Sequence, residues 1–396
     1  MKRRVVLHFP GFEPLDAERH RARYERAMQR TAELWGLDAD VGTLQQEDRR
    51  AYFDIETSRP EDAWRTSSRF FVFDHGAIVD HLGARPLVTR LAQGFRSAAA
   101  VVIEGGAFGY FRHAWRFGLF FIFPFLLVGL GMGISLALAT YPLWLGLGLW
   151  QLPLGIALGY LFFAKLFIPW SDRFHTLHLF SDWEMAVAVS RLDNAIVNDW
   201  IEASTQAARQ AFELPADEYV ISSHSMGSSM AAQTIGLLLE REPELFAGKR
   251  VVFVTLGGAT LQCALLRSAS VLRARVGLIA GAKNVTWLEV QCLTDVISFY
   301  KSSVTALTGH PDAPQPRLVF LRIKNMLFAD RYKRIKLDFL RVHRQYVLAS
   351  DRRSNFDFGL MTAGPLAAVT FRRFSGEWGQ DAELDYPQGA VNGELH

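Results

Sequence analysis

The chain has 396 residues, half of them hydrophobic, with 43 Lys and Arg against 40 Asp and Glu. Its length is ample for a buried core, and its composition excludes a disordered or collagen-like protein. The formal net charge of +3 is too small to indicate a nucleic-acid partner. The basic N-terminus does not predict a secretory signal, because its apolar run stops at His8 and Pro10.

Short runs of β-branched and aromatic residues predict strands on both sides of a long apolar segment. These runs cover residues 4–9, 39–44, 51–57, 69–74, 218–223, 250–256, 284–290 and 317–323. Helical patterns cover residues 16–35, 84–100, 182–212, 228–240 and 265–282. Near-continuous apolar strands separated by helices are typical of a mostly parallel sheet covered on both faces. We therefore expect an α/β fold with a sheet of about eight strands.

The middle of the chain is strongly apolar, since residues 117–169 contain a single charge, Lys165. One transmembrane helix needs about 20 apolar residues, so this stretch predicts two spans joined by a tight turn. With the turn at Tyr141-Pro142, the spans cover residues 117–140 and 146–168. A buried core hairpin is an alternative, and so is a re-entrant hairpin that its prolines bend. These prolines are Pro124, Pro142 and Pro153.

The residues around the apolar stretch predict its orientation in a membrane. Aromatic residues lie where interface belts are expected, namely Trp115, Trp170, Tyr141, Trp144 and Trp150. Basic residues gather at the outer ends and not at the turn, namely Arg112, Arg116, Lys165 and Arg173. By the positive-inside rule, both termini and the flanking domain are expected on the cytoplasmic side of the inner membrane. Two glycine pairs, Gly129/Gly133 and Gly155/Gly159, would let the two helices approach closely.

Neither flank alone supplies a complete sheet, so we expect one α/β domain that the hairpin interrupts. This interpretation places a first part at 1–112, the hairpin at 113–172, a second part at 173–375 and a flexible tail at 376–396. The two cysteines, Cys263 and Cys292, form neither a disulfide framework nor a zinc-type cluster. A reducing compartment and the absence of a metal are expected, and no pattern indicates an oligomeric state.

The predicted strand 218–223 runs into Ser223-His224-Ser225-Met226-Gly227, and a helical pattern follows. This arrangement resembles the nucleophile elbow of the α/β-hydrolase superfamily, G-x-S-x-G, where a sharp strand-to-helix turn needs small residues around the serine. Gly227 fits the pattern, and Ser223 departs from it by another small residue. The resemblance implies a serine lipase or esterase with Ser225 as the nucleophile. A serine-rich helix cap without chemistry is the alternative.

In this family the nucleophile is followed along the chain by an acid and then by a histidine. Asp295 lies in the loop after the predicted strand 284–290 and resembles the acid. Glu289, inside that strand, is the weaker candidate.

Three histidines lie downstream of Asp295, namely His310, His343 and His396. His343 follows the last predicted strand and resembles the base, whereas His310 precedes that strand in a proline-rich turn. His224 adjoins Ser225, and neighbouring side chains on such a turn point apart, so we do not expect it to be the base.

The resemblance also implies an oxyanion hole made of two backbone amides. One is the amide of Met226, directly after the nucleophile. The other would come from His8-Phe9-Pro10-Gly11-Phe12, which resembles the His-Gly loop of many lipases with two residues inserted between His8 and Gly11. Pro10 has no amide proton, which leaves Phe9 or Phe12 as the donor. His8 is expected to orient the loop.

The segment 322–353 carries ten Lys and Arg against three Asp, and it contains His343. A solvated basic face is one interpretation, and attraction to anionic lipid headgroups is the other. Under the second interpretation the active site opens toward lipid. Candidates for an acyl path are then Phe70, Phe71, Phe108, Phe111 and Trp115, for most of which core packing is the alternative.

Taken together, these patterns predict a membrane-anchored serine hydrolase without a cofactor. It would cleave an acyl ester or thioester of a lipid-like substrate through an acyl-enzyme on Ser225. Two alternatives stay open. The same residues would also support acyl transfer to an alcohol, and a non-catalytic membrane scaffold would retain the fold without the chemistry.

Overall fold

The computed structural model describes residues 2–47, 50–59, 61 and 64–377. Within them lies a nine-stranded sheet in the order β2-β4-β5-β1-β6-β7-β8-β9, with β3 paired to β4. Its strands are β1 (Arg3–Phe9), β2 (Asp38–Val41), β3 (Gln45–Glu47), β4 (Arg50–Arg59), β5 (Trp64–Val72), β6 (Glu218–His224), β7 (Val251–Leu256), β8 (Val285–Cys292) and β9 (Arg317–Leu321). The predicted α/β fold is confirmed. Beyond Glu377, the tail expected at 376–396 lies outside the described residues.

The sheet is mostly parallel, as predicted. Strands β5, β1, β6, β7, β8 and β9 run in one direction, and β2, β3 and β4 add antiparallel pairs at one edge. The strand that the sequence did not predict is β3, whose three exposed residues, Gln-Gln-Glu, carry no apolar pattern.

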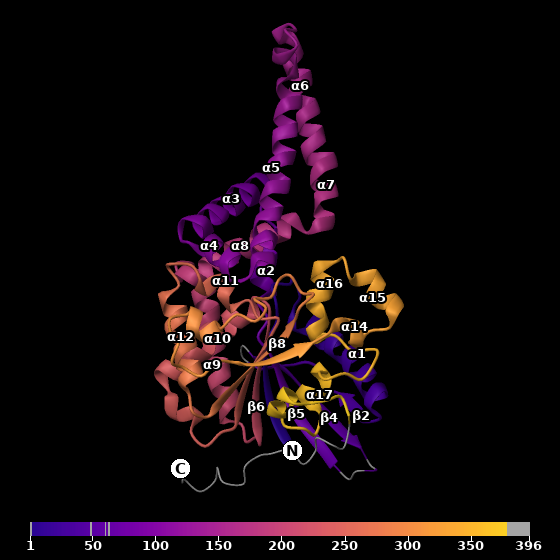
Figure 1. Ribbon diagram of the computed structural model, residues 1–396, viewed down its shortest axis with the longest axis vertical. Coiled ribbons are helices and arrows are strands. Elements are labelled where there is room, and N and C mark those ends of the chain that lie inside the picture. Colours follow the sequence, from indigo (N-terminus) through magenta and orange to yellow (C-terminus); the bar gives the residue numbers. More distant parts are fainter. Residues whose placement is uncertain (1, 48–49, 60, 62–63, 378–396) are drawn as a thin grey trace.

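Helices cover both faces of the sheet (Figure 1). On one face lie α9 (Ala195–Glu213), α10 (Gly227–Arg241) and α12 (Ser270–Gly281), and on the other lie α1 (Ala17–Trp35) and α17 (Phe358–Ala363). Alternate side chains of each strand enter the two cores, so that Leu7 packs with the first group and Val6 with the second. Shorter helices of the body are α2 (Gly76–Gly83), α11 (Thr260–Ala264), α13 (Val304–Leu307), α14 (Ile323–Met326), α15 (Ala329–Ile335) and α16 (Phe339–Arg344).

The chain reverses its direction of travel across the sheet at β1 and β6. Strand β1 leads to α1 on one face, whereas its neighbour β6 leads to α10 on the other face. In open α/β sheets such a switch point leaves a crevice at the carboxyl ends of the two strands, and ligands bind there. The loops after β1 and β6 are therefore where a functional site is expected.

A two-helix hairpin stands off one end of this body (Figure 1). Its first arm is α5 (Trp115–Trp144), and its second arm joins α6 (Leu152–Tyr160), a π-helical stretch (Leu161–Phe167) and α7 (Ile168–Ser171). Within the described residues, Trp115–Trp144 and Leu149–Phe174 are long and apolar enough to cross a membrane, and only 33% and 17% of their most apolar windows are buried. The hairpin is thus not a buried core element.

The turn of the hairpin differs from the prediction. Helix α5 continues through Tyr141-Pro142 to Trp144, and the chain turns over residues 145–148 with Gly146 at φ 65°. A proline removes only one helical hydrogen bond, and near the end of a helix that loss costs little.

Of the two glycine pairs predicted to let the helices approach closely, only the pair on the second arm does so. An added Cβ on Gly155 or Gly159 would lie 2.5 Å from a carbonyl oxygen of α5, so these glycines let the arms approach closely. An added Cβ on Gly129 or Gly133 would meet nothing within 4 Å, so this half of the prediction is wrong. The rotation of α5 instead turns Gly131 toward Phe167 of the second arm.

The helical segments at the base of the hairpin are interrupted at two places, and the second interruption divides the predicted helix 182–212. Helices α3 (Leu87–Ile103) and α4 (Gly106–His113) are separated by Gly105 at φ 83°. Helix α8 (Thr176–Arg191) ends at Leu192 with φ 53°, and Asn194 caps the start of α9 by accepting hydrogen bonds from two amides. Aromatic rings fasten α5 to this layer, with Phe125 stacked on Phe180 at 4.6 Å between ring centroids.

Candidate active site

Ser225 occupies a strained turn between β6 and α10. Its φ of 54° is in the left-handed region, which residues other than glycine rarely adopt. Close packing maintains the turn, since an added Cβ on Gly227 would lie 2.2 Å from the carbonyl oxygen of Phe9. The small Ser223 is buried and donates a hydrogen bond to the Val254 carbonyl at 3.2 Å, which explains why serine suffices two residues before Ser225.

His343 and Asp295 form a buried pair after β9 and β8. His343 Nδ1 lies 2.8 Å from Asp295 Oδ2, and both side chains are less than 5% exposed, at 4% and 0%. The carboxylate also accepts hydrogen bonds from the Tyr346 hydroxyl at 3.0 Å and from the Ile297 amide at 3.0 Å. Because a carboxylate accepts here, Nδ1 of His343 carries the proton and Nε2 is left to accept. That Nε2 is buried and has no partner among the described residues.

Ser225 and His343 line the same cavity, whose volume is about 40 Å³. It lies between the carboxyl edge of the sheet and the base of the hairpin. Its other lining residues are Gly11, Phe12, Glu13, Phe120, His178, Leu179, Asp182, His224, Gln262, Ile297, Leu340 and Arg344. No hydrogen bond joins Ser225 to His343 in the described structure, and catalytic hydrogen bonds of this kind often shorten only when substrate is bound.

The loop after β1 runs beside Ser225. An added Cβ on Gly11 would lie 3.2 Å from Ser225 Cβ, so only glycine lets the loop pass this close. Of the two predicted amide donors, Phe12 lines the cavity, whereas Phe9 stacks its ring on Phe73 in the core. Among the described residues, the amides of Phe12 and Met226 make no hydrogen bond.

His8 lies away from the cavity. Its Nδ1 is 3.2 Å from the Ser222 hydroxyl, and its ring packs between Phe70 and Phe358. Burial holds the pKa of His8 well below its usual value, so the ring is neutral. The expected orienting role is therefore restricted to packing beneath the loop.

His224 contacts the pair without joining it. Its Nε2 lies 2.9 Å from the backbone carbonyl of His343, and its Nδ1 has no partner among the described residues. Burial, followed by the nearby His343, lowers the pKa of His224 to about 3. The ring is therefore a neutral donor that fixes the backbone of His343, in keeping with the expectation that it is not the base.

The other sequence candidates lie elsewhere. Glu289 accepts a hydrogen bond from Gln291 at 2.9 Å, and His310 lies 3.0 Å from the Arg273 carbonyl. Phe70 and Phe71 are core residues, while Phe108 is 71% exposed, and none of them lines the cavity. Phe111 and Trp115, also proposed for an acyl path, do not line it either. His396 is outside the described residues.

An ionic cluster beside the cavity was not predicted from the sequence. Glu13 lies 2.6 Å from Arg23 of α1 and 2.8 Å from Arg344, the neighbour of His343. Burial opposes the charge on Glu13, but Arg23 and Arg344 outweigh it and lower the pKa to about 2. The cluster ties the loop after β1 to the helix that carries His343, through residues too far apart in sequence for any local pattern to pair them.

Tyr346 was also missed, although a signal existed. It lies three residues after His343, a spacing that places two side chains on one face of a helical turn. Its hydroxyl accepts a hydrogen bond from the Cys292 amide at 2.9 Å while donating to Asp295.

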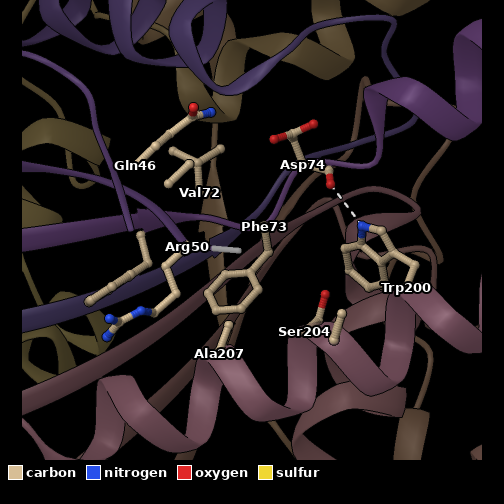
Figure 2. Close-up of a pocket in the computed structure, with 11 residues that line it drawn as sticks. Gln46, Arg50, Val72, Phe73, Asp74, Trp200, Ser204 and Ala207 are labelled. Atoms are coloured by element: carbon tan, nitrogen blue, oxygen red, sulfur yellow. Dashed lines mark hydrogen bonds between the residues drawn. The ribbon is translucent and has the colours of Figure 1, made fainter. Parts of the chain in front are cut away.

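A larger cavity is separate from this site (Figure 2). It has a volume of about 310 Å³ and opens beside β5 and α9. Two of its polar side chains have partners within the protein, since Arg50 pairs with Glu47 at 3.2 Å and Trp200 Nε1 donates to the Asp74 carbonyl at 2.8 Å. The described residues contain no cluster of His, Cys, Asp or Glu that would hold a metal ion.

Comparisons with protein-family models, with curated proteins and with solved structures find no match to this chain.

Proposed function

We propose that the protein is a membrane-anchored serine hydrolase with an α/β-hydrolase-like body, which cleaves an acyl ester or thioester of a lipid-like substrate. One observation carries the proposal. A serine at φ 54°, between a buried strand and a helix, shares a cavity with a histidine whose Nδ1 is bonded to a buried carboxylate. A structural serine needs neither the strained turn nor the unpartnered Nε2 of His343.

In the proposed reaction His343 Nε2 accepts the proton of the Ser225 hydroxyl as the oxygen attacks the substrate carbonyl. Asp295 holds the imidazole in the required tautomer and offsets the charge of the imidazolium. His343 then returns the proton to the leaving alcohol or thiol, which gives an acyl-enzyme on Ser225. Water, deprotonated by His343, hydrolyses that ester and releases the acid.

The developing oxyanion would be stabilised by the amides of Met226 and Phe12. These two groups donate no hydrogen bond in the described structure, and they lie on the two loops that meet at Ser225. Removal of one such donor typically costs 100-fold or more in rate.

The hairpin supports the membrane part of the proposal. Residues 126–144 of α5, beyond the part that packs on the body, rise about 28 Å at 1.5 Å per residue. This length is close to the hydrocarbon thickness of a bilayer, about 30 Å. The carboxyl edge of the sheet would then lie at the membrane surface, with the basic residues Arg112, Arg116 and Arg173 around the base of the hairpin.

The substrate would enter between α5 and α16. Phe120 of α5 lines the cavity and lies 5.6 Å from Phe339 of α16, measured between ring centroids. A cavity of about 40 Å³ holds a few atoms only, so the acyl chain has to separate these rings. With the base of the hairpin at the membrane surface, Phe120 of α5 would lie on the side from which a lipid-like substrate arrives.

Labelling with a fluorophosphonate probe tests the enzyme assignment. Wild type and the control Ser223→Ala are expected to label, because Ser223 bonds the Val254 carbonyl beneath the turn and does not line the cavity. Ser225→Ala should not label, and His343→Ala should label far more slowly. A wild-type protein that is folded but unlabelled would favour the scaffold alternative. Product analysis with an added alcohol then separates hydrolysis from acyl transfer.

Cysteine labelling tests the membrane assignment. Both native cysteines are buried, so single cysteines introduced by Leu147→Cys at the turn and Glu377→Cys at the other end of the molecule report alone. In sealed vesicles an impermeant maleimide should reach the two positions from opposite sides. Labelling of both from the same side would instead show a re-entrant hairpin.

A further inference from the structure

A second buried carboxyl group, Asp182 of α8, lines the cavity that contains Ser225 and His343. The residue is 8% exposed, so its side chain is almost fully enclosed. Gln262 of α11 donates a hydrogen bond from Nε2 to Asp182 Oδ2 at 2.9 Å. The other carboxyl oxygen, Oδ1, accepts no hydrogen bond from the described residues, and the proposed acyl-enzyme chemistry gives the group no role.

Among the described residues, none offers a permanent cation to Asp182. The titratable groups that interact with it are His343, Tyr110 of α4 and Cys263 of α11, and none of these is a permanent positive charge. The one arginine that lines the cavity, Arg344, is paired with Glu13 at 2.8 Å. Apolar side chains, including Phe120 and Leu179, complete the walls.

A carboxyl group in this position is costly for the protein alone. Burial raises the pKa of Asp182 to about 6, and the hydrogen bond from Gln262 only partly opposes that rise. At neutral pH the group is mostly an anion without a counter-charge, and buried charges in proteins are normally paired. A donor brought by a ligand would satisfy it.

We propose that Asp182 and Gln262 recognise a hydrogen-bond donor on the substrate, an ammonium or hydroxyl group close to the scissile acyl bond. This inference rests on the proposed hydrolase function. The donor has to lie close to the reacting carbonyl, since Ser225 and Asp182 line one cavity of about 40 Å³. Gln262 holds the carboxylate so that Oδ1 remains for the ligand. Lipids with an amino or hydroxyl group beside the ester or thioester are the substrate class that results.

The test compares esters of one fatty acid with 2-aminoethyl, 2-hydroxyethyl and propyl alcohols, and a second set that carries the same groups at C2 of the acyl chain. In one of the two sets, the kcat/KM of wild type is expected to be at least about tenfold higher for an amino or hydroxyl compound than for the matched alkyl compound. Asp182→Asn should reduce this ratio about tenfold, while the exposed control Asp193→Asn should keep it.

The pH dependence separates the two donors. If the ligand is an ammonium group, the preference over the alkyl compound should fall as the pH drops through about 6, because Asp182 becomes neutral. If it is a hydroxyl group, the preference should persist, since a neutral carboxyl still accepts a hydrogen bond.

A preference that a folded Asp182→Asn variant retains in full would overturn the proposal, and the wild-type measurement tests it even if that variant misfolds. Equal kcat/KM for the amino, hydroxyl and alkyl compounds in both sets would overturn it. Fluorophosphonate labelling of Ser225 in the same preparation separates the outcomes. If the enzyme is labelled but shows no preference, only the Asp182 proposal is wrong. If the protein is not labelled, the hydrolase proposal is wrong.

Discussion

The sheet and the hairpin are built from similarly apolar sequence, but they expose it very differently. Every residue of β7 is buried, whereas Leu126, Leu130 and Leu136 of α5 are 63%, 62% and 65% exposed. Layers of helices exclude water from the sheet, and no comparable layer covers the outer hairpin in the described structure. Apolar sequence by itself therefore does not determine burial, and an uncovered apolar helix pair marks a surface that contacts a membrane or another protein.

Charged groups also distinguish the two regions. The α/β body contains buried charged residues at the carboxyl edge of its sheet, whereas the hairpin contains almost none. The largest expected effect comes from Asp295→Asn. It keeps the shape of the side chain but leaves His343 in the wrong tautomer, and in a serine–histidine–aspartate site this lowers kcat about 10⁴-fold.

The measurement is steady-state hydrolysis of a short-chain ester by protein in detergent. Asp338→Asn is the control, since that half-buried aspartate caps α16 and pairs with Arg341 at 3.2 Å, and asparagine caps a helix equally well. Activity of Asp295→Asn within tenfold of wild type would remove Asp295 from the proposed mechanism.

The next comparison is between two glycines of the α/β body, Gly227 in a tightly packed position and Gly281 in an open one. Gly227→Ala would place a Cβ 2.2 Å from the Phe9 carbonyl oxygen, which the backbone can relieve only by moving. We expect a loss of about 3 kcal/mol in the free energy of unfolding. Gly281→Ala, where nothing lies within 4 Å, should be neutral or slightly stabilising. Denaturant titration of both variants in detergent checks the pair, and equal stabilities would contradict the packing described for the turn.

The pH dependence of stability is a further test of the α/β body, which contains the buried ion pairs of Glu13. The pKa of Glu13 falls from 4.5 to about 2 in the folded protein, so its ion pairs stabilise the body fully above pH 4.5 and are lost as the pH falls toward 2. The shift corresponds to roughly 3 kcal/mol. Glu13→Gln should therefore destabilise the protein by about this amount at pH 7 and much less at pH 2.5.

Thermal unfolding at both pH values measures the effect. The exposed Glu18 is the control, since Glu18→Gln should change stability little at either pH. A Glu13→Gln variant that is equally destabilised at pH 7 and pH 2.5 would show that the ion pairs with Arg23 and Arg344 contribute nothing.

The sequence predicts the parts of the fold that depend on local patterns. Strands such as β6 and β7 are apolar along their whole length, and the sheet they form was expected. Ser225, Asp295 and His343 follow strands β6, β8 and β9, and because the carboxyl ends of parallel strands share one edge, their convergence was expected. Their chemical roles stay predictions that the labelling experiment tests.

Other features depend on tertiary contacts that no local pattern encodes. The pairing of Glu13 with Arg344 and the position of Asp182 beside Ser225 require the whole fold. The breaks at Gly105 and Leu192 each depend on one left-handed residue within otherwise helical sequence. The face that α5 presents to the second arm depends on helix rotation, which an almost uniformly apolar sequence does not determine.

The packing of α5 against the second arm gives the smallest expected effect. Two glycines of the hairpin, Gly159 and Gly133, allow a direct comparison. Gly159→Ala would place a Cβ 2.5 Å from the Ser135 carbonyl oxygen and separate the two arms, whereas Gly133→Ala meets nothing within 4 Å. Because packing between small residues is a main source of stability for helices in lipid, we expect Gly159→Ala to lose about 1 kcal/mol. A disulfide between introduced cysteines near the turn reports the separation of the arms through its rate of formation. Slower cross-linking in the Gly159 variant and an unchanged rate in the Gly133 variant are expected. The reverse order would mean that α5 turns its other face toward the second arm in the membrane.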